Sequence, residues 1–252
     1  MLNMKRIAII LVVLAAAGCT RGRDVYLLIG QSNMAGRGYM ELPQDTLAPL
    51  KGVFLLGPED KPVPAKNPLN QYSTIRKSLE LQQIGPGTGF SEAMYRHNGK
   101  EILLVVNAKG GSKLKDWTEG TDFYNEAVRR TREAAKYGTL KGILWHQGCS
   151  DCSESGIASY MEKLSPMVEA LRRDLGVDET VPFIAGEIGY WVGMSAEFNG
   201  MIHSVTENIP GSAWVSAEGC GMRAAENDPH FSREGQFILG RRYAEKLIEM
   251  TR

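Results

Sequence analysis

A serine flanked by glycines follows the first apolar segment of the chain. Ser32 lies in Gly-Gln-Ser-Asn-Met-Ala-Gly-Arg-Gly, directly after the run 25–29. Glycines let the backbone turn tightly, so the hydroxyl could serve as a nucleophile while its own N–H faces a developing oxyanion. The alternative is a glycine-rich turn whose serine only caps a helix. The sequence contains neither a P-loop pattern nor the Gly-x-Ser-x-Gly elbow of ordinary α/β-hydrolases.

Four histidines could supply the base that a serine nucleophile needs. His230 stands two residues after Asp228, and among the four it alone has a carboxylate nearby in sequence to orient it. His146 follows a strand-like run and could line the site. His97 lies in a charged turn and His203 in a helical pattern, which fit solvated and structural roles. We therefore predict that His230 is the base.

Further polar groups follow two other strand-like runs. Gly110 and Gly111 come shortly after the run 102–106, and paired glycines can offer backbone N–H groups to an anion. A loop that needs one positive φ explains either glycine equally well. Gln147 follows the run 142–145 and could donate its side-chain amide, although glutamines at strand ends are commonly satisfied polar residues. These groups are candidates for an oxyanion hole.

The residues above must be positioned by strands and helices, which the sequence indicates as short apolar runs that alternate with helical patterns. Runs that are apolar throughout indicate strands covered on both faces, and they span 25–29, 53–56, 102–106, 142–145, 182–185 and 213–215. Apolar positions at helical spacing predict helices over 89–97, 123–136, 157–175, 196–208 and 234–250. The stretch 57–72, rich in Pro and Asn, is predicted to be irregular.

This alternation predicts an α/β fold, a three-layer α/β/α sandwich around a central, mainly parallel sheet. In such sheets ligands bind at the carboxyl ends of the strands. Ser32, Gly110 and Gln147 each follow a predicted strand. We therefore expect them to gather at one edge of the sheet.

Several blocks of the chain resemble a known family of esterases. The blocks are VYLLIGQSNMAGRG, GG-S-x-L-x-x-W, ILWHQG-x-SD and DPHFS-x-EGQ-x-x-LGRRYAE, in the expected order along the chain. They look like the sialate O-acetylesterase and acetylxylan esterase group, carbohydrate esterase family six, within the SGNH-hydrolase superfamily. The resemblance implies a flavodoxin-like three-layer fold and deacetylation of a carbohydrate without a metal or other cofactor.

The resemblance also implies roles for particular residues. Ser32 is the expected nucleophile and His230 the base. The expected oxyanion donors are the N–H groups of Ser32 and of Gly110 or Gly111, together with Gln147. Four further residues are predicted to contact the substrate: Gln31, Asn33, His146 and Trp117.

The chain departs from the family pattern at two places. Cys149 follows WHQG, where the family usually has Glu, so any hydrogen bonds of that Glu must be redistributed. The terminal block of the family usually reads Asp-x-x-His, which would put the acid at Asn227. Charge favours Asp228 instead, because a carboxylate can stabilise the imidazolium of the base, and we predict Asp228 as the third member of the triad. A main-chain carbonyl, or a distant acid such as Glu187, could also orient His230.

The amino terminus has the three parts of a bacterial export signal: Lys5-Arg6, an apolar run over 7–17, and small residues before Cys19. The run is shorter than the about 20 apolar residues that span a membrane. We predict a signal peptide over 1–18, a linker over 19–23 and one esterase domain over 24–252. Lipidation of Cys19 would anchor the protein at the cell envelope, and ordinary secretory cleavage is the alternative.

The charge and the cysteine content of the chain limit the ligands and cross-links that can be expected. The chain has 29 basic and 29 acidic residues, and this balance gives no electrostatic support for nucleic-acid binding. Cys149, Cys152 and Cys220 would remain besides Cys19, and we predict that Cys220 forms a disulfide with one of the other two. A lone Cys-x-x-Cys is a weak metal signal, so no metal site is expected.

The sequence thus predicts an exported serine esterase that removes acetyl groups from carbohydrates of the acetylxylan or sialic acid type through an acetyl-enzyme. Two different functions stay open. One is that of a surface lipoprotein that binds glycans without turning them over, and the second is that of a sugar O-acetyltransferase on the same scaffold. The particular glycan and the oligomeric state are not encoded in any pattern that we can interpret.

Overall fold

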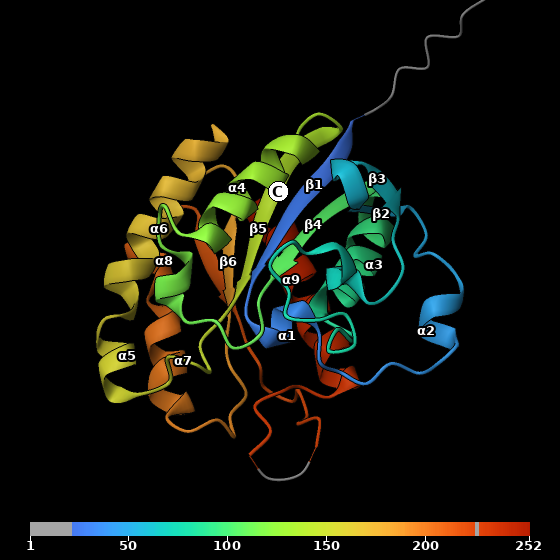
Figure 1. Cartoon of the computed structure of the whole chain (residues 1–252). Coiled ribbons are helices and arrows are strands. Elements are labelled where there is room, and N and C mark those ends of the chain that lie inside the picture. The colour runs from blue at the N-terminus through green and yellow to red at the C-terminus, as the bar shows by residue number, and fades with distance from the viewer. Residues whose placement is uncertain (1–21, 225–226) are drawn as a thin grey trace, which may run out of the picture.

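The computed structural model describes residues 22–224 and 227–252 (Figure 1). The predicted signal peptide, the proposed anchor at Cys19 and most of the predicted linker lie outside the described residues. No helix within the described ranges is both long enough and apolar enough to cross a membrane.

A seven-stranded sheet forms the middle layer, with the strand order β3-β2-β4-β1-β5-β6-β7. All neighbouring strands pair in parallel except β2 and β3, which are antiparallel. The strands are β1 (Arg23–Gly30), β2 (Val53–Leu56), β3 (Pro62–Pro64), β4 (Ile102–Ala108), β5 (Gly138–His146), β6 (Phe183–Gly186) and β7 (Ser212–Val215).

Helices cover both faces of this sheet (Figure 1). The α-helices are α1 (Ser32–Ala35), α2 (Gln44–Leu47), α3 (Pro86–Asn98), α4 (Asp122–Ala134), α5 (Glu154–Ala158), α6 (Tyr160–Leu175), α7 (Ser195–His203), α8 (Val205–Asn208) and α9 (Arg233–Met250). The short 3₁₀ helices are η1 (Pro58–Asp60), η2 (Leu69–Tyr72) and η3 (Leu114–Trp117). The three-layer α/β/α architecture predicted from the sequence is confirmed.

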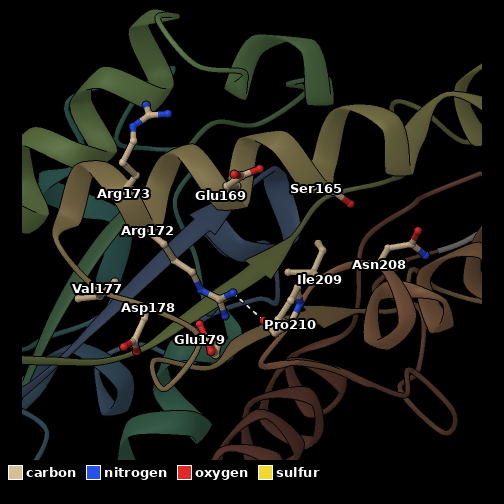
Figure 2. Close-up of a pocket in the computed structure, with 10 residues that line it drawn as sticks. All are labelled: Ser165, Glu169, Arg172, Arg173, Val177, Asp178, Glu179, Asn208, Ile209 and Pro210. Atoms are coloured by element: carbon tan, nitrogen blue, oxygen red, sulfur yellow. Dashed lines mark hydrogen bonds between the residues drawn. The ribbon is translucent and has the colours of Figure 1, made fainter.

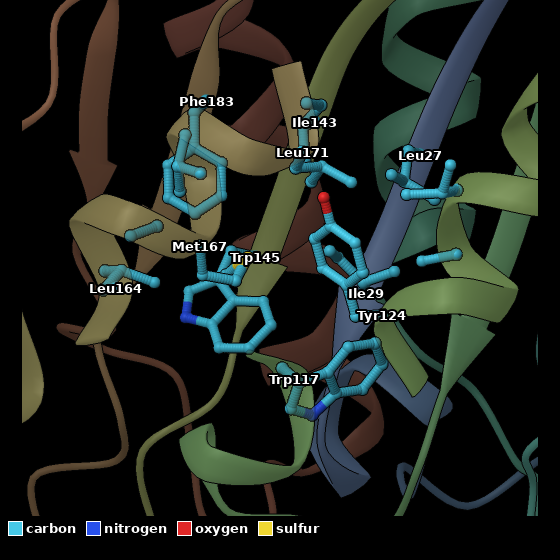
Figure 3. Packing of buried hydrophobic residues seen from close by; sticks show 14 of the residues in the cluster. Leu27, Ile29, Trp117, Tyr124, Ile143, Trp145, Leu164, Met167, Leu171 and Phe183 are labelled. Carbon is cyan, nitrogen blue, oxygen red and sulfur yellow. The ribbon is translucent and has the colours of Figure 1, made fainter. Parts of the chain in front are cut away.

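Two hydrophobic clusters hold the layers together, one on each face of the sheet. Successive side chains of a strand point to opposite faces, so β1 contributes Leu27 and Ile29 to one cluster and Tyr26 and Leu28 to the other. Helices α4, α6, α7 and α8 pack on the first face, part of which is shown in Figure 3. Helices α3 and α9 pack on the second face. Burial on both faces explains why the strands are apolar throughout.

All six predicted strands are present, and the differences from the prediction have local causes. The structure adds β3 inside the stretch 57–72, where Pro62 and Pro64 mask the strand pattern; at the edge of a sheet, proline is tolerated because one side of the strand needs no ladder bonds. Two predicted helices are each broken in two. The breaks fall at Ser159 and Ser204, whose hydroxyls bond back to carbonyls of the preceding turn.

Helices α3 and α9 approach each other closely through glycines. A Cβ atom on Gly89 would lie 2.6 Å from the carbonyl oxygen of Phe237, and one on Gly240 would collide with the carbonyl oxygen of Pro86. Only glycine at these positions lets the two backbones meet. The contact matters for the site because α9 is the helix that follows the loop of the predicted base.

Candidate active site

The predicted nucleophile, base and acid lie in one hydrogen-bonded row. The Oγ atom of Ser32 is 3.0 Å from Nε2 of His230, and Nδ1 of the same ring is 2.5 Å from Oδ1 of Asp228. An ionised carboxylate can only accept, so Nδ1 carries the proton and Nε2 is free to accept the proton of the serine hydroxyl. This geometry is that of a nucleophile activated by an oriented base.

Local backbone geometry places Ser32 at the carboxyl end of β1. Gly30 has a φ of 135°, and a Cβ atom there would collide with the backbone of His146 on the neighbouring strand β5. The chain can therefore turn sharply, and the amide of Gln31 donates to the carbonyl of His146 at 2.8 Å. Ser32 then begins α1, where its N–H has no acceptor within the helix.

Asn33, which we predicted to contact the substrate, instead joins the nucleophile to the loop of the base. Its side chain is fully buried. Its Nδ2 donates to the carbonyl of Pro229 at 3.1 Å, and its Oδ1 accepts from the amide of Phe231 at 3.1 Å. Nε2 of Gln236, on α9, donates to the same oxygen at 3.2 Å. The prediction for Asn33 is wrong, since every polar atom of this side chain holds the segment on either side of His230.

The structure places Asp228, and not Asn227, against His230. Asn227 has a φ of 72° and an exposed side chain, so the chain turns there and carries the carboxylate that follows towards the ring. Oδ1 of Asp228 also accepts from the backbone amide of His230 at 3.1 Å, and Oδ2 accepts from Nε of Arg223 at 2.7 Å. Glu187, the distant candidate for the acid, bonds instead to His203 and to groups beyond β6 and β7.

These contacts favour an ionised acid. Burial raises the pKa of Asp228, but the hydrogen bonds from Arg223 and from the amide of His230 outweigh that effect and hold the pKa below its ordinary value. Nε1 of Trp191 donates to the carbonyl of Asp228 at 2.7 Å, which fixes the backbone of the acid as well.

The pKa of His230 is lowered from its ordinary value, first by burial and further by the charges of Arg223 and Arg37, against the opposing effect of Asp228. The neutral ring is the active form of a base, so a lower pKa keeps the site active at lower pH. We expect the acid limb of the kcat/KM profile to have its midpoint below about 6.5, the value of an unperturbed histidine. Initial rates with a neutral acetyl ester across the acid range test this. A midpoint at or above the unperturbed value would contradict it.

The turn after β4 brings one of the two predicted glycines close to Ser32. Gly110 is buried, and a Cβ atom on it would lie 3.7 Å from Cβ of Ser32. The amide of Ser112 donates to the carbonyl of Lys109, and Gly111 takes a φ of 77° inside this turn. Gly111 is exposed and lies nearer to Lys77. Of the two glycines, Gly110 is therefore the one that lies beside Ser32.

Gln147 is not available as an oxyanion donor, which corrects our prediction. The side chain is fully buried, and its Nε2 already faces three acceptors: Oδ2 of Asp151 at 2.6 Å, the carbonyl of Ser112 at 3.1 Å and Oε1 of Gln31 at 3.2 Å. Its Oε1 accepts from the hydroxyl of Tyr160 at 2.6 Å. An amide with two hydrogens has none left for a ligand, so Gln147 braces the loop that carries Gly110.

Comparisons with known proteins identify the group to which this architecture belongs. A family model described as "Carbohydrate esterase, sialic acid-specific acetylesterase" matches residues 22–249. The chain belongs to this family. It is therefore a hydrolase of the carbohydrate acetylesterase class.

One curated relative and two solved structures match about nine tenths of the chain, and a second curated relative matches less than half of it. A probable carbohydrate esterase of Arabidopsis thaliana is 29% identical over 245 residues, which cover 89% of this chain and 90% of that protein. A probable 9-O-acetyl-N-acetylneuraminic acid deacetylase of Escherichia coli is 31% identical over 133 residues, 44% of this chain and 38% of that protein. Among solved structures, one from Arabidopsis thaliana has a TM-score of 0.79 at 26% identity and covers 90% of this chain and 98% of its own. NanS has a TM-score of 0.74 at 19% identity over 91% and 98% of the two chains, which supports the shared fold.

Gln31 and Trp117, which we also predicted to contact the substrate, are buried and hold neighbouring loops in place. Oε1 of Gln31 accepts from the amides of Gly148 and Ser150, so this side chain ties α1 to the loop after β5. Trp117 is 1% exposed, packs edge-on against Trp145 and donates from Nε1 to Oγ of Ser112 (Figure 3). Neither side chain is exposed to a ligand, because hydrogen bonds to the loop after β5 hold Gln31 and packing against Trp145 covers Trp117.

His146 is a third such correction. It is fully buried, with Nε2 3.0 Å from the carbonyl oxygen of Glu187 and the ring against Phe231. Burial lowers its pKa to about 4, so the folded protein holds this ring neutral.

This buried ring predicts an acid-dependent loss of stability. Unfolded His146 takes up a proton near pH 6.5, whereas folded His146 does so only near the lower value. Its stabilising contribution is therefore complete above about pH 6.5 and lost as the pH falls, by about 2 kcal/mol between pH 7 and pH 5. Urea unfolding of the wild type and of His146→Gln at both pH values measures the difference. An equal pH dependence in the two proteins would show that His146 does not contribute to it.

The cysteines also differ from the prediction. Cys149, Cys152 and Cys220 are all free thiols, so the predicted disulfide is wrong. Cys149 and Cys152 pack against the cluster on the α4 and α6 face, whereas Cys220 is buried in the cluster on the α9 face. The sheet separates them. Burial raises the pKa of Cys149 to about 12, so this thiol stays protonated at neutral pH.

A separate surface cavity of about 460 Å³ lies away from the triad (Figure 2). Its walls come from α6 and from the segments that enter β6 and β7, at the amino edge of the sheet. Arg172 dominates it and donates to the carbonyl oxygens of Pro210, Val181 and Gly211, so this arginine ties the helix to both segments. Ligands of open α/β sheets bind at the opposite edge. In the described ranges, no cluster of three or more His, Cys, Asp or Glu side chains could hold a metal ion.

Two arginines beside the triad were not predicted from the sequence. Arg223 comes from the loop between β7 and α9 and bonds to Asp228, and Arg37 follows α1 and lies against Gly110. Arg37 is part of the GQSNMAGRG block that characterises the resemblance, and that position was the available signal. Nothing in the sequence around Arg223 indicated its role.

Proposed function

We propose that the chain removes O-acetyl groups from carbohydrates through an acetyl-enzyme formed on Ser32. The observation that carries this proposal is the row from Ser32 through His230 to Asp228, with distances of 3.0 and 2.5 Å. A lone serine hydroxyl is a weak nucleophile, and a base within hydrogen-bond reach, itself held by an acid, is the arrangement that activates it. The carboxyl ends of β1 and β4 position the nucleophile and Gly110 together.

In the first half of the reaction, Nε2 of His230 takes the proton of Ser32 while Oγ attacks the acetyl carbonyl carbon. The carbonyl oxygen becomes an oxyanion that accepts from the N–H groups of Ser32 and Gly110. When this intermediate collapses, the bond to the sugar oxygen breaks and that oxygen takes the proton from His230. The sugar leaves with a free hydroxyl, and the acetyl group remains on Ser32.

Water completes the cycle by the same steps. His230 takes a proton from water as the water oxygen attacks the acetyl carbon, and collapse of the second oxyanion breaks the bond to Oγ. The serine recovers its proton from His230, and acetate leaves. Asp228, held ionised by Arg223, stabilises the imidazolium in both halves.

The substrate class proposed here is an O-acetylated sugar, with O-acetylated sialic acids as the first candidates. The support is the description of the matching family and the name of the Escherichia coli relative, whose similarity spans only part of each chain. Acetylated xylan is the second candidate, because the sequence blocks resemble both groups of esterases.

Two measurements test the function and the substrate together. Acetate release from O-acetyl sialic acids, acetylated xylan and acetylated pectin ranks the substrates by kcat/KM. Rapid quenching during turnover, followed by peptide mass analysis, should find an acetyl group on the peptide that contains Ser32. Acetate release with an acetyl group on another residue, or no release from any sugar ester, would overturn the proposal.

A further inference from the structure

Because Nε2 of Gln147 is bonded to Asp151, Ser112 and Gln31, the expected oxyanion donors that remain are the backbone amides of Ser32 and Gly110. The side chain of Arg37 lies beside Gly110. It is 7% exposed, and its Nη1 donates to the carbonyl of Gly36 at 2.6 Å, which fixes the guanidinium. Its Nη2 lies 2.6 Å from the point where a Cβ atom on Gly110 would be. Cβ of Ser32 is 3.7 Å from the same point.

The absence of a side chain at position 110 is therefore a condition for this arrangement. Any Cβ there would push the guanidinium away from the serine, because 2.6 Å is shorter than real side-chain contacts. The turn needs a positive φ only at Gly111, so the turn alone does not explain glycine at position 110. The space taken by Arg37 does explain it.

Within residues 22–224 and 227–252, no carboxylate forms an ion pair with Arg37, whereas its neighbour Arg223 is paired with Asp228. Burial lowers the pKa of Arg37 to about 10, with a smaller contribution from Arg223, and the side chain stays protonated at neutral pH. A buried charge without a partner is unfavourable. An anion that forms next to Ser32 would relieve that cost.

The proposed reaction supplies such an anion at one moment only. The ester is neutral when it binds, and negative charge develops on its carbonyl oxygen as Oγ attacks. A donor that interacts more strongly with the oxyanion than with the ester accelerates the chemical step and not merely binding. A rigid, buried guanidinium beside the nucleophile meets that requirement better than a solvated cation would.

We propose that Arg37 is a catalytic residue that donates from Nη2 to the oxyanion, as the third member of the oxyanion hole with the N–H groups of Ser32 and Gly110. This inference rests on the proposed serine mechanism. It assigns to Arg37 the part that the family resemblance gave to Gln147.

The test is Arg37→Gln, assayed on p-nitrophenyl acetate and on the corresponding thionoacetate, in which sulfur replaces the carbonyl oxygen. Loss of one oxyanion donor should lower kcat by about 10²- to 10³-fold with little change in KM. Sulfur accepts hydrogen bonds poorly, so the wild type should strongly prefer the oxygen ester. Arg37→Gln should reduce this preference, because the thionoester loses less than the oxygen ester. A variant with near wild-type kcat, or one that loses equally on both esters, would overturn the proposal.

Two further variants keep the test decisive. Lys77→Gln removes an exposed cation near Gly111 and should leave both rates unchanged, which separates a directed hydrogen bond from the general positive potential. Arg37→Lys keeps the charge but loses the planar fork, so it should show a smaller loss and a smaller change in the oxygen-to-sulfur preference. If Arg37→Gln does not fold, as judged by thermal unfolding, the preference of Arg37→Lys decides.

Two outcomes point elsewhere. If Arg37→Gln raises KM only for sugar esters that carry a carboxylate and spares the neutral ester, Arg37 binds substrate and the proposal is wrong. If Ser32→Ala itself retains turnover, the serine mechanism has failed. A Ser32→Ala variant without activity, together with a fully active Arg37→Gln, would reject the role of Arg37 alone.

Discussion

Replacing Ser32 with alanine should lower kcat by roughly 10⁶-fold, the loss seen when the nucleophile of a hydrolytic triad is removed. In the proposed mechanism Oγ forms the covalent bond to the acetyl group, and no other hydroxyl is bonded to His230 in the described part of the chain. The fold should be unaffected, because the hydroxyl makes no contact that another element requires. Acetate release, corrected for spontaneous hydrolysis, measures the loss.

A matched control is Ser91→Ala. Ser91 is also buried, but its hydroxyl donates to the carbonyl of Thr88 within α3. This variant should retain nearly full activity while its thermal unfolding reports any cost of removing a buried serine hydroxyl. Activity of Ser32→Ala within about tenfold of the wild type would eliminate Ser32 as nucleophile, because that loss is far below the value for a triad serine.

Replacing Asp228 with asparagine should lower kcat by about 10⁴-fold, the size of effect known for the acid of a serine triad. An amide in this place can donate to Nδ1 and so favour the wrong tautomer of His230, and it cannot offset the charge of the imidazolium. The matched change is Asn227→Gly at the neighbouring exposed position, which tolerates the φ of 72° and should retain most activity. Paired kcat/KM values for the two variants test the choice between them.

Arg223→Gln adds an intermediate case. It removes the donor that holds Oδ2 but leaves the carboxylate beside His230. Activity should therefore fall less than in Asp228→Asn. Collapse of Asn227→Gly together with an active Asp228→Asn would show that His230 is oriented by another group.

The fold could be predicted from the sequence because each strand is short, apolar throughout and separated from the next by a helical pattern. Such strands fit only a sheet covered on both faces, which fixes the edge where Ser32 and Gly110 emerge. The strand β3 could not be predicted, because edge position and not composition decides whether Pro62 and Pro64 fit a strand.

The site was only partly predictable, because the role of a polar side chain depends on its neighbours in the folded protein. The pairing of Ser32, His230 and Asp228 follows from residue chemistry and local spacing. The roles of Gln147 and Asn33 depend on which donors and acceptors surround each side-chain amide in the folded protein. The sequence does not show that Gln147 bonds to Asp151, or that Asn33 bonds to the distant Phe231. The same amide can hold a ligand or brace a loop, and only its surroundings distinguish the two roles.

The loop of the base is tied at both ends to distant parts of the chain, and this has a consequence for biosynthesis. Ser32 and His230 are 198 residues apart, and Asn33 reaches Phe231 across the same separation. The α9 helix that follows them reaches its place only when its glycine contact with α3 closes. An elongating chain would therefore carry its nucleophile long before it possesses a base. Esterase activity would therefore appear as one of the last events of maturation, after the central strands have paired and α9 has packed on α3.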